Sequence, residues 1–363
     1  MYDLIVVGGG PAGASAAITC ARNGARVVLL ERGRFPRHKV CGEFVSAESL
    51  DLFADLLAPQ DQQLLADAVR IARARVFLDG RVIETPVDPP AASISRLDLD
   101  AALWDSAEQC GVEGRQQVIV QTISGSDPFL VDTSVGEFES RALINASGRW
   151  SNLNRTPTNG QSSGVKWLGL KGHFSESSPH PSVDLYFFEG GYCGVQPVNM
   201  MDGFEQSVNA CAMVRADVAS TLSEVFICHP ALQERSREWK PLSDPVSTSP
   251  LVFSEPQPER DGILMAGDAA AFVDPFVGDG ISLALRSGSL ASECLLPFFA
   301  GSLSLAQAAR NYRSAYEQQL APVFHMSSKI RRMLSLPQII RTPILSLLEK
   351  SPAIKQYLVS KTR

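Results

Sequence analysis

Short apolar runs near both ends of the chain are each followed by a glycine-rich turn. The first run, residues 3–7, leads into Gly8-Gly9-Gly10-Pro11-Ala12-Gly13, an alanine-rich stretch to Asn23 and a second apolar run at residues 25–30. Apolar runs of this length are typical of buried strands, and the stretch between them is long enough for a helix. The order predicts a strand, a helix and a second strand parallel to the first.

The rest of the pattern predicts a second sheet and a return to the first. Helical spacing of leucines predicts helix over residues 47–75, and a second helix begins after Arg96 and ends near Gly111. Short β runs predict a meander over residues 112–144, a return strand at 142–146, and a mostly antiparallel set at 165–170, 183–188, 192–198, 208–214 and 246–253. The chain returns at 262–266, continues into a helix at 282–296, and ends in helices broken by prolines.

The first turn carries a dinucleotide fingerprint. Gly8 allows the tight turn, Gly10 lets the backbone approach a pyrophosphate, and Gly13 lets the helix lie close to the sheet. The free N–H groups at the start of the helix then face the phosphates, and Glu31, at the end of the second strand, is placed to bind a ribose. A glycine motif alone could be an ordinary strand-to-helix turn, but the complete order of elements favours an adenine dinucleotide.

A second turn of the same kind lies near the other end of the chain. Asp268 ends the apolar run at 262–266, and the glycine-rich segment 275–281 precedes a helix. An aspartate there suits a polyol hydroxyl, and a helix start suits negative charge at the N1/C2 edge of a reduced flavin. Two such turns indicate one extended dinucleotide held between them.

We therefore expect an α/β fold of two domains and a helical tail. Its parts are a Rossmann-type FAD-binding domain with an inserted β-meander (1–75, 92–160 and 258–300), an antiparallel β-rich (α+β) substrate domain (76–91 and 161–257) and a C-terminal helical region (301–363). A polar linker at 151–161 joins the first two.

Composition narrows the partners and the compartment. The 363 residues carry a net charge of −6, which gives no electrostatic case for binding nucleic acid. After Met326 the chain has eight Lys or Arg residues and one acidic residue, Glu349. The last helices could therefore lie on an anionic membrane or pack across the substrate domain. The seven cysteines are scattered and include no C-x-x-C pair, so they predict neither disulfides nor a metal site and favour the reducing cytoplasm. The first predicted strand begins almost at Met1, which leaves no room for a signal peptide and also favours the cytoplasm.

Three further segments have two interpretations each. The basic loop 32–43 is either a solvated turn or a cationic rim that brings Cys41 beside a redox centre. Asp98 could cap the helix that follows while Arg96 stays outside it, free to reach a phosphate or ribityl chain; a plain capping turn is the alternative. The glycines before Tyr192 let a ligand approach, or form a hairpin with a bulge.

The segments Gly8 to Gly13, Pro36 to Glu43, Arg96 to Asp98, Gly267 to Ala270 and Asp274 to Ile281 together resemble a known family. They are similar to the FAD-dependent superfamily of geranylgeranyl reductases, p-hydroxybenzoate hydroxylase-type enzymes and flavin-dependent halogenases, with geranylgeranyl reductase-like proteins most similar. The resemblance implies that they hold the pyrophosphate, the flavin edge with its cysteine, the ribityl region and the isoalloxazine ring. Halogenases carry two tryptophans where this chain has Tyr192 and Gly194, and usually another residue at position 41, so halogenation is disfavoured.

From these arguments we expect a specific set of site residues. The cofactor-binding residues are Gly8, Gly10, Pro11, Ala12, Gly13, Glu31, Arg32, Arg37, Cys41, Arg96, Val118, Gly267, Asp268, Pro275, Gly278, Gly280 and Ile281. We expect Gly191 and Tyr192 to contact substrate. Cys41 is the candidate proton donor, since an ordinary thiol is protonated at neutral pH; a buried, inert cysteine is the alternative.

The resemblance implies an FAD-dependent oxidoreductase with a hydrophobic small-molecule substrate. Our first hypothesis is hydride transfer from reduced flavin to a C=C bond of an isoprenoid- or polyketide-like compound. The alternatives are an aromatic monooxygenase that uses a flavin hydroperoxide, and, less favoured, a halogenase or a non-catalytic FAD-binding protein. Because the chain has no second dinucleotide fingerprint, NAD(P)H visits the flavin transiently or an electron-donor protein replaces it.

Overall fold

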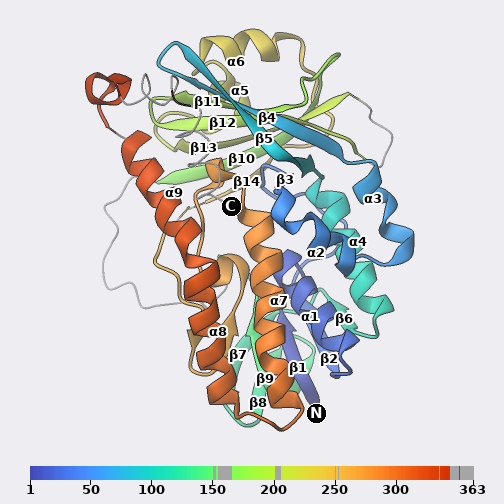
Figure 1. Cartoon of the computed structure of the whole chain (residues 1–363). Coiled ribbons are helices and arrows are strands. Elements are labelled where there is room, and N and C mark those ends of the chain that lie inside the picture. Colours follow the sequence, from blue (N-terminus) through green and yellow to red (C-terminus); the bar gives the residue numbers. More distant parts are fainter. Residues whose placement is uncertain are drawn as a thin grey trace.

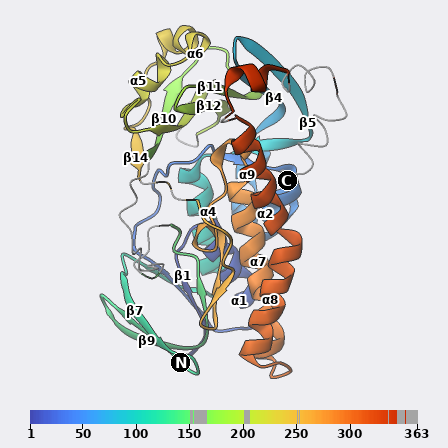
Figure 2. The same cartoon turned by 90° about the vertical axis from the view of Figure 1, so that its left-hand side faces the viewer.

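The protein is described here from a computed structural model that covers residues 1–149, 153, 166–200, 206–249, 251, 253–334, 336–343 and 351. Its helices and strands form two sheets and a group of long helices. In Figure 1 the second sheet lies above, the first sheet lies below, and the long helices α7 and α8 run beside the first sheet. The 90° view in Figure 2 shows the same two layers from the side.

The first sheet contains the strand–helix–strand unit predicted from the N-terminus. Its central strands are parallel and follow the order β16-β9-β1-β2-β6, while β15 pairs with β16 and the hairpin β7-β8 pairs with β9, both antiparallel. The strands are β1 (Tyr2–Val7), β2 (Val27–Glu31), β6 (Glu113–Gln116), β7 (Val120–Gly125), β8 (Phe129–Thr133), β9 (Gly136–Asn145), β15 (Glu259–Arg260) and β16 (Ile263–Met265). This is the Rossmann-type sheet with its inserted meander that the sequence predicted.

The second sheet is antiparallel except where β4 pairs with β11, and its order is β14-β10-β13-β12-β11-β4-β5-β3. Its strands are β3 (Phe44–Val45), β4 (Val69–Leu78), β5 (Arg81–Ser93), β10 (Trp167–Ser175), β11 (Ser182–Phe188), β12 (Gly191–Val198), β13 (Ser207–Arg215) and β14 (Val246–Thr248). The short helices α5 (Leu222–Phe226) and α6 (Pro230–Arg235) cover its outer face (Figure 1).

Two helices of the lower layer pack unusually close together. A Cβ on Gly288, in α7 (Gly280–Phe299), would lie 2.1 Å from the carbonyl oxygen of Ala12, in α1 (Pro11–Arg22). Ser15 and Ser292 donate hydrogen bonds across the same contact, to the carbonyls of Leu285 and Ala16 at 2.8 and 2.9 Å. Small residues therefore bring together two helices that begin at the two glycine-rich turns.

The remaining helices complete the chain. They are α2 (Leu50–Leu56), α3 (Gln63–Ala66), α4 (Arg96–Gln109), α8 (Leu305–Gln319) and α9 (Ala321–Leu334). In Figure 1, α9 continues upward from α8 to the edge of the second sheet. Within the part of the chain that the structure describes, no helix is long and apolar enough to cross a bilayer.

Two predictions about the elements were wrong, and others fall on residues that the structure does not describe. Residues 69–75, predicted as helix and assigned to the first domain, form β4 of the second sheet. The cap of α4 is Ser95, whose hydroxyl accepts a hydrogen bond from the Asp98 N–H at 3.1 Å, so Asp98 does not cap the helix. Apart from Leu153, the predicted linker at 151–161 lies outside the described residues, as do the predicted helices after residue 343.

Candidate cofactor and substrate site

Both glycine-rich turns line one cavity of about 530 Å³, which is also lined by strands of the second sheet. All the predicted site residues except Gly13 and Gly191 line it: Gly8, Gly10, Pro11, Ala12, Glu31, Arg32, Arg37, Cys41, Arg96, Val118, Tyr192, Gly267, Asp268, Pro275, Gly278, Gly280 and Ile281. The geometry therefore brings together residues from both ends of the chain. Their individual roles toward a cofactor stay predictions.

The turn before α1 is closely packed at Gly13 and open at Gly10. A Cβ on Gly13 would lie 1.8 Å from the Gly8 carbonyl oxygen, so this glycine sets the packing of helix on strand and does not face the cavity. At Gly10 the nearest atom to such a Cβ would be Nη2 of Arg96, 3.9 Å away. The space at Gly10 is thus open on the cavity side, where the N–H groups of the helix start are free to bind an anion.

Glu31 ends β2 with its carboxylate bound at both oxygens. Oε2 accepts a hydrogen bond from the Gly9 N–H at 2.8 Å, and Oε1 accepts from the Gly33 N–H at 2.7 Å and from Arg37 at 2.9 Å. Burial alone would raise the pKa of Glu31, but Arg37 and the two amides hold it below its ordinary value. The carboxylate is therefore charged and fixes the turn beside which it lies.

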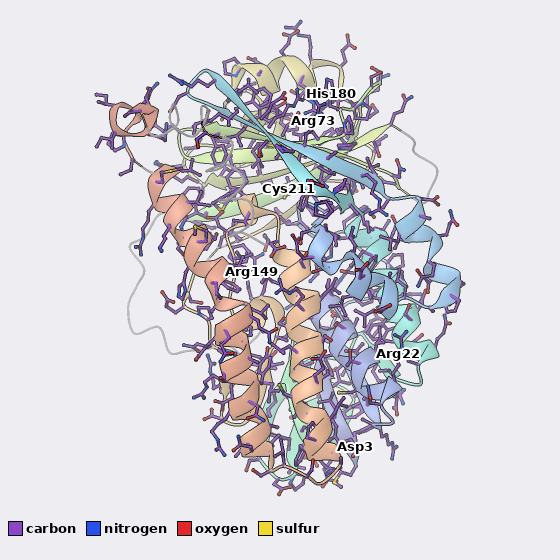
Figure 3. The ribbon with its side chains drawn as sticks, viewed as in Figure 1. Asp3, Arg22, Arg73, Arg149, His180 and Cys211 are labelled. Carbon is purple, nitrogen blue, oxygen red and sulfur yellow. The ribbon has the colours of Figure 1, made fainter. Side chains whose placement is uncertain are left out.

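The second turn lies against the first at the cavity. Asp268 follows β16 and lies 3.4 Å from Nε of Arg149, which itself stacks on the ring of Phe272 at 4.0 Å. Figure 3 shows Arg149 near the middle of the molecule, below the second sheet. Nη1 of Arg149 is buried without a hydrogen-bond partner among the described residues, so it can donate a hydrogen bond at the site. Arg149 was not among the site residues predicted from the sequence. Its position directly after a strand of the first sheet was the signal available in the sequence.

Cys41 and Arg96 lie side by side at the cavity wall. The Cys41 sulfur accepts a hydrogen bond from the Glu43 N–H at 3.3 Å, and its carbonyl accepts one from the Asn209 side chain at 3.0 Å. Arg96 donates two hydrogen bonds to Asp100, at 2.8 and 2.7 Å. Burial lowers the pKa of Arg96, but Asp100 and the Cys41 sulfur outweigh it and raise the pKa above its ordinary value. The guanidinium stays charged next to the thiol.

A buried ionic cluster behind Cys41 was not predicted. Glu43 is fully buried, has φ of +62°, and bonds to Lys171, to Nε2 of His173 at 2.8 Å and to the Arg96 backbone N–H at 2.7 Å. Lys171 and His173 belong to β10 of the second sheet. Because an unpaired buried charge is costly, the cluster ties the Cys41 loop to the second sheet.

A second, mostly apolar cavity of about 270 Å³ adjoins the first. Six residues line both cavities: Gly42, Phe44, Tyr192, Cys211, Pro275 and Gly278. Apolar side chains of β4, β5 and β11 form one wall and Ile330, Met333 and Leu334 of α9 form another. Cys211, labelled in Figure 3, lies on the second sheet above Arg149.

Tyr192 lines both cavities, and its predicted contact with substrate stays a prediction. Its hydroxyl is buried without a hydrogen-bond partner among the described residues. Gly191, the other predicted substrate contact, lines neither cavity, because a Cβ there would lie 2.5 Å from the carbonyl oxygen of Met213 on β13. Gly191 therefore serves close strand packing, and its predicted contact with substrate stays a prediction.

The sequence is similar to those of known proteins. A family model described as "FAD dependent oxidoreductase" matches residues 3–42. Digeranylgeranylglycerophospholipid reductase 2 of Methanopyrus kandleri is 26% identical over 92% of this chain and 87% of its own length. Menaquinone reductase of Mycobacterium tuberculosis is also 26% identical, over 94% of this chain and 86% of its own.

Solved structures share the fold. A geranylgeranyl bacteriochlorophyll reductase-like protein of Thermoplasma acidophilum superposes with a TM-score of 0.78 at 18% identity, covering 99% of this chain and 95% of its own. A flavin-dependent brominase superposes equally well, with a TM-score of 0.78 at 20% identity over 99% and 93% of the two chains. The matched fingerprint and the two reductases of similar sequence indicate that the chain is an FAD-dependent oxidoreductase, and its fold is that of the two solved flavoproteins.

Proposed function

We propose that this enzyme reduces a C=C bond of a hydrophobic, isoprenoid- or polyketide-like substrate. The observation that carries the proposal is the second cavity, which is lined mainly by apolar side chains and shares a wall with the FAD cavity. A pocket of that kind suits an apolar chain better than a small polar molecule. Two relatives are named as reductases of a digeranylgeranylglycerophospholipid and of menaquinone, which supports the same class.

The residues around the first cavity fit FAD. The α1 turn with Gly10 would hold the pyrophosphate, Asp268 and Arg96 the ribityl region, and the start of α7 the ring system. When bound and reduced, FAD supplies a hydride to one carbon of the double bond. NAD(P)H or an electron-donor protein would restore the reduced cofactor.

Cys41 supplies the matching proton in this proposal. The other carbon of the double bond takes the proton from the Cys41 sulfur, and the thiolate left behind lies beside the charged guanidinium of Arg96. Solvent later returns the proton to the thiolate, so the substrate gains two hydrogens in all. Asp100 holds Arg96 in place through two hydrogen bonds.

The apolar second cavity would also keep water away from the reacting bond. Its polar lining includes Ser46, Thr85, Gln196 and Asp279, few enough to orient one polar group of the substrate.

The seven cysteines are all free, which suits the reducing cytoplasm.

Anaerobic mixing tests the proposal. Enzyme reduced without O₂ is mixed with menaquinone or a geranylgeranyl lipid, and the flavin absorbance and the mass of the product are followed. We expect reoxidation and a product heavier by two hydrogens, slowed at least about 100-fold in Cys41→Ala without loss of bound flavin. Reoxidation that requires O₂ and adds oxygen to an aromatic substrate would instead establish the monooxygenase.

A further inference from the structure

Exposed apolar side chains lie on segments that adjoin the walls of the second cavity in the sequence. Ile339 and Ile340 are 88% and 52% exposed, and Val82, at the start of β5, is 47% exposed. The helical segment 338–343 is tied to the β4–β5 turn, because Arg341 donates hydrogen bonds to the two carboxylate oxygens of Asp79 at 2.9 and 2.6 Å. Figures 1 and 2 both show this segment beside the tip of the β4–β5 hairpin.

Helix α9 places positive charge next to these side chains. One stripe of the helix, with Ile330, Met333 and Leu334, lines the second cavity. A stripe at helical spacing on another face carries the exposed His325, Lys329 and Arg332. We call Val82, Lys329, Arg332, Ile339 and Ile340 together the rim.

Charge near the rim is mainly positive although the whole chain is acidic. The chain has a net charge of −6, so this local excess of cations differs from the rest of the surface. Asp79, at the β4–β5 turn, is paired with Arg341, and the exposed Glu255 lies 3.9 Å from the His325 imidazole. Lys329 and Arg332 therefore present their charge outward beside exposed isoleucines.

We propose that the rim docks on an anionic lipid bilayer. Exposed isoleucines suit insertion at the boundary between headgroups and acyl chains, and lysine and arginine beside them suit anionic headgroups. An isologous contact with a second copy would set the cations of the two rims against each other, which argues against a dimer here.

The docked orientation would supply the substrate. The elements that carry the rim, the β4–β5 hairpin and α9, also wall the second cavity, through Val76, Leu78 and Ile83 on one side and Met333 and Leu334 on the other. An apolar chain could thus pass from the bilayer into the cavity with little exposure to water. This step rests on the proposed function, whereas binding of the rim to a bilayer does not.

Sedimentation with vesicles tests the docking. The full-length, FAD-loaded protein is mixed with sucrose-loaded vesicles of pure phosphatidylcholine or of phosphatidylcholine with 30% phosphatidylglycerol, a mixture chosen at roughly the anionic content that polybasic segments detect. We expect strong sedimentation only with the anionic vesicles, weakened by salt. The variants Lys329→Glu/Arg332→Glu and Ile339→Ser/Ile340→Ser should each weaken binding about tenfold or more.

A matched pair of changes controls for general effects of charge and polarity. Arg237→Glu and Ile227→Ser alter an exposed cation and an isoleucine that is 63% exposed, both on the outer side of the second sheet, and should bind as the parent does. The proposal fails if the parent ignores anionic vesicles, if the rim variants bind as the parent does, or if the rim isoleucines prove to hold a dimer in sedimentation velocity. Because vesicle binding is measured without turnover, it can succeed even if the proposed reduction is wrong.

Discussion

Gly267 and Ala12 lie in contact although they come from opposite ends of the chain. Gly267 has φ of +59°, and a Cβ placed on it would lie 2.9 Å from the Cβ of Ala12. The turn after β16 therefore rests directly on the start of α1. This contact explains why both turns line a single cavity.

Two alanine substitutions in the first turn should separate folding from cofactor binding. Gly13→Ala forces a methyl group to 1.8 Å from the Gly8 carbonyl oxygen, so we expect a loss of several kcal/mol of stability, about 2–4. Gly10→Ala meets only Arg96, at 3.9 Å, so it should fold normally and yet bind FAD at least about tenfold more weakly. Urea unfolding and FAD titration of the two variants check this. Equal stability of both variants would contradict the assigned roles.

Removing the charge of Glu43 should destabilise the fold. Glu43→Gln leaves Lys171 buried without its counter-charge, which typically costs about 3–5 kcal/mol. The exposed pair of Arg237 with Glu234 offers a control, since Glu234→Gln should change stability by less than about 0.5 kcal/mol. Urea unfolding at pH 7 measures both.

The lowered pKa of Glu43 predicts how the free energy of unfolding depends on pH. Burial raises the pKa of Glu43, but Lys171 and His173 lower it to about 2. Its stabilising contribution is therefore complete above its ordinary pKa, about 4.3, and is lost as the pH falls toward 2. The gap in stability between the parent and Glu43→Gln should narrow over that interval. A gap that stays constant would show that Glu43 is not charged in the folded protein.

Asp279 should have the opposite pH dependence. Burial raises its pKa to about 6, although the Ser46 hydroxyl donates a hydrogen bond to it at 2.7 Å. The folded protein then retains a proton that the unfolded chain releases between about pH 4 and 6, so stability falls as the pH rises through that range. Asp279→Asn should be more stable than the parent by about 1–3 kcal/mol at pH 8 and equal to it near pH 4. Urea unfolding across that range would contradict this if the difference did not vary with pH.

Removing the Tyr192 hydroxyl should lower kcat/KM without lowering the stability of the fold. Because the buried hydroxyl has no described partner, Tyr192→Phe should keep or slightly raise stability, while kcat/KM falls about 3- to 10-fold if the hydroxyl binds the substrate's polar group. Tyr186 is a matched control, since its hydroxyl accepts a hydrogen bond from Arg235 at 3.2 Å and lines neither cavity. Tyr186→Phe should reduce stability and leave kcat/KM unchanged; the reverse pattern would remove Tyr192 from the substrate site.

Parts of the site that lie within one short segment could be predicted from the sequence. Both turns and the basic loop could be recognised because each is one continuous segment after a strand. The error at residues 69–75 came from extending a helical pattern past its leucines, although charged and apolar residues already alternate in Val69-Arg70-Ile71 and again in Arg73-Ala74-Arg75.

Features that depend on distant pairing could not be predicted. Glu43, Lys171 and His173 meet only because β10 lies behind the Cys41 loop, and no spacing in the sequence records that contact. The second cavity likewise needs β4, β5 and α9 to assemble around it. The sequence could not show the strand packing at Gly191, because close strand packing and close approach to a ligand both favour glycine.

Titration with FAD and with ADP tests the central claim, that both turns hold one molecule of FAD. ADP carries only the adenylate end, so Gly10→Ala should weaken binding of both ligands, whereas Gly280→Ala, which meets only Val273 at 3.9 Å, should weaken FAD and leave ADP unchanged. We expect one FAD per chain. An equal loss of ADP and FAD in Gly280→Ala, or no loss of either, would contradict the account.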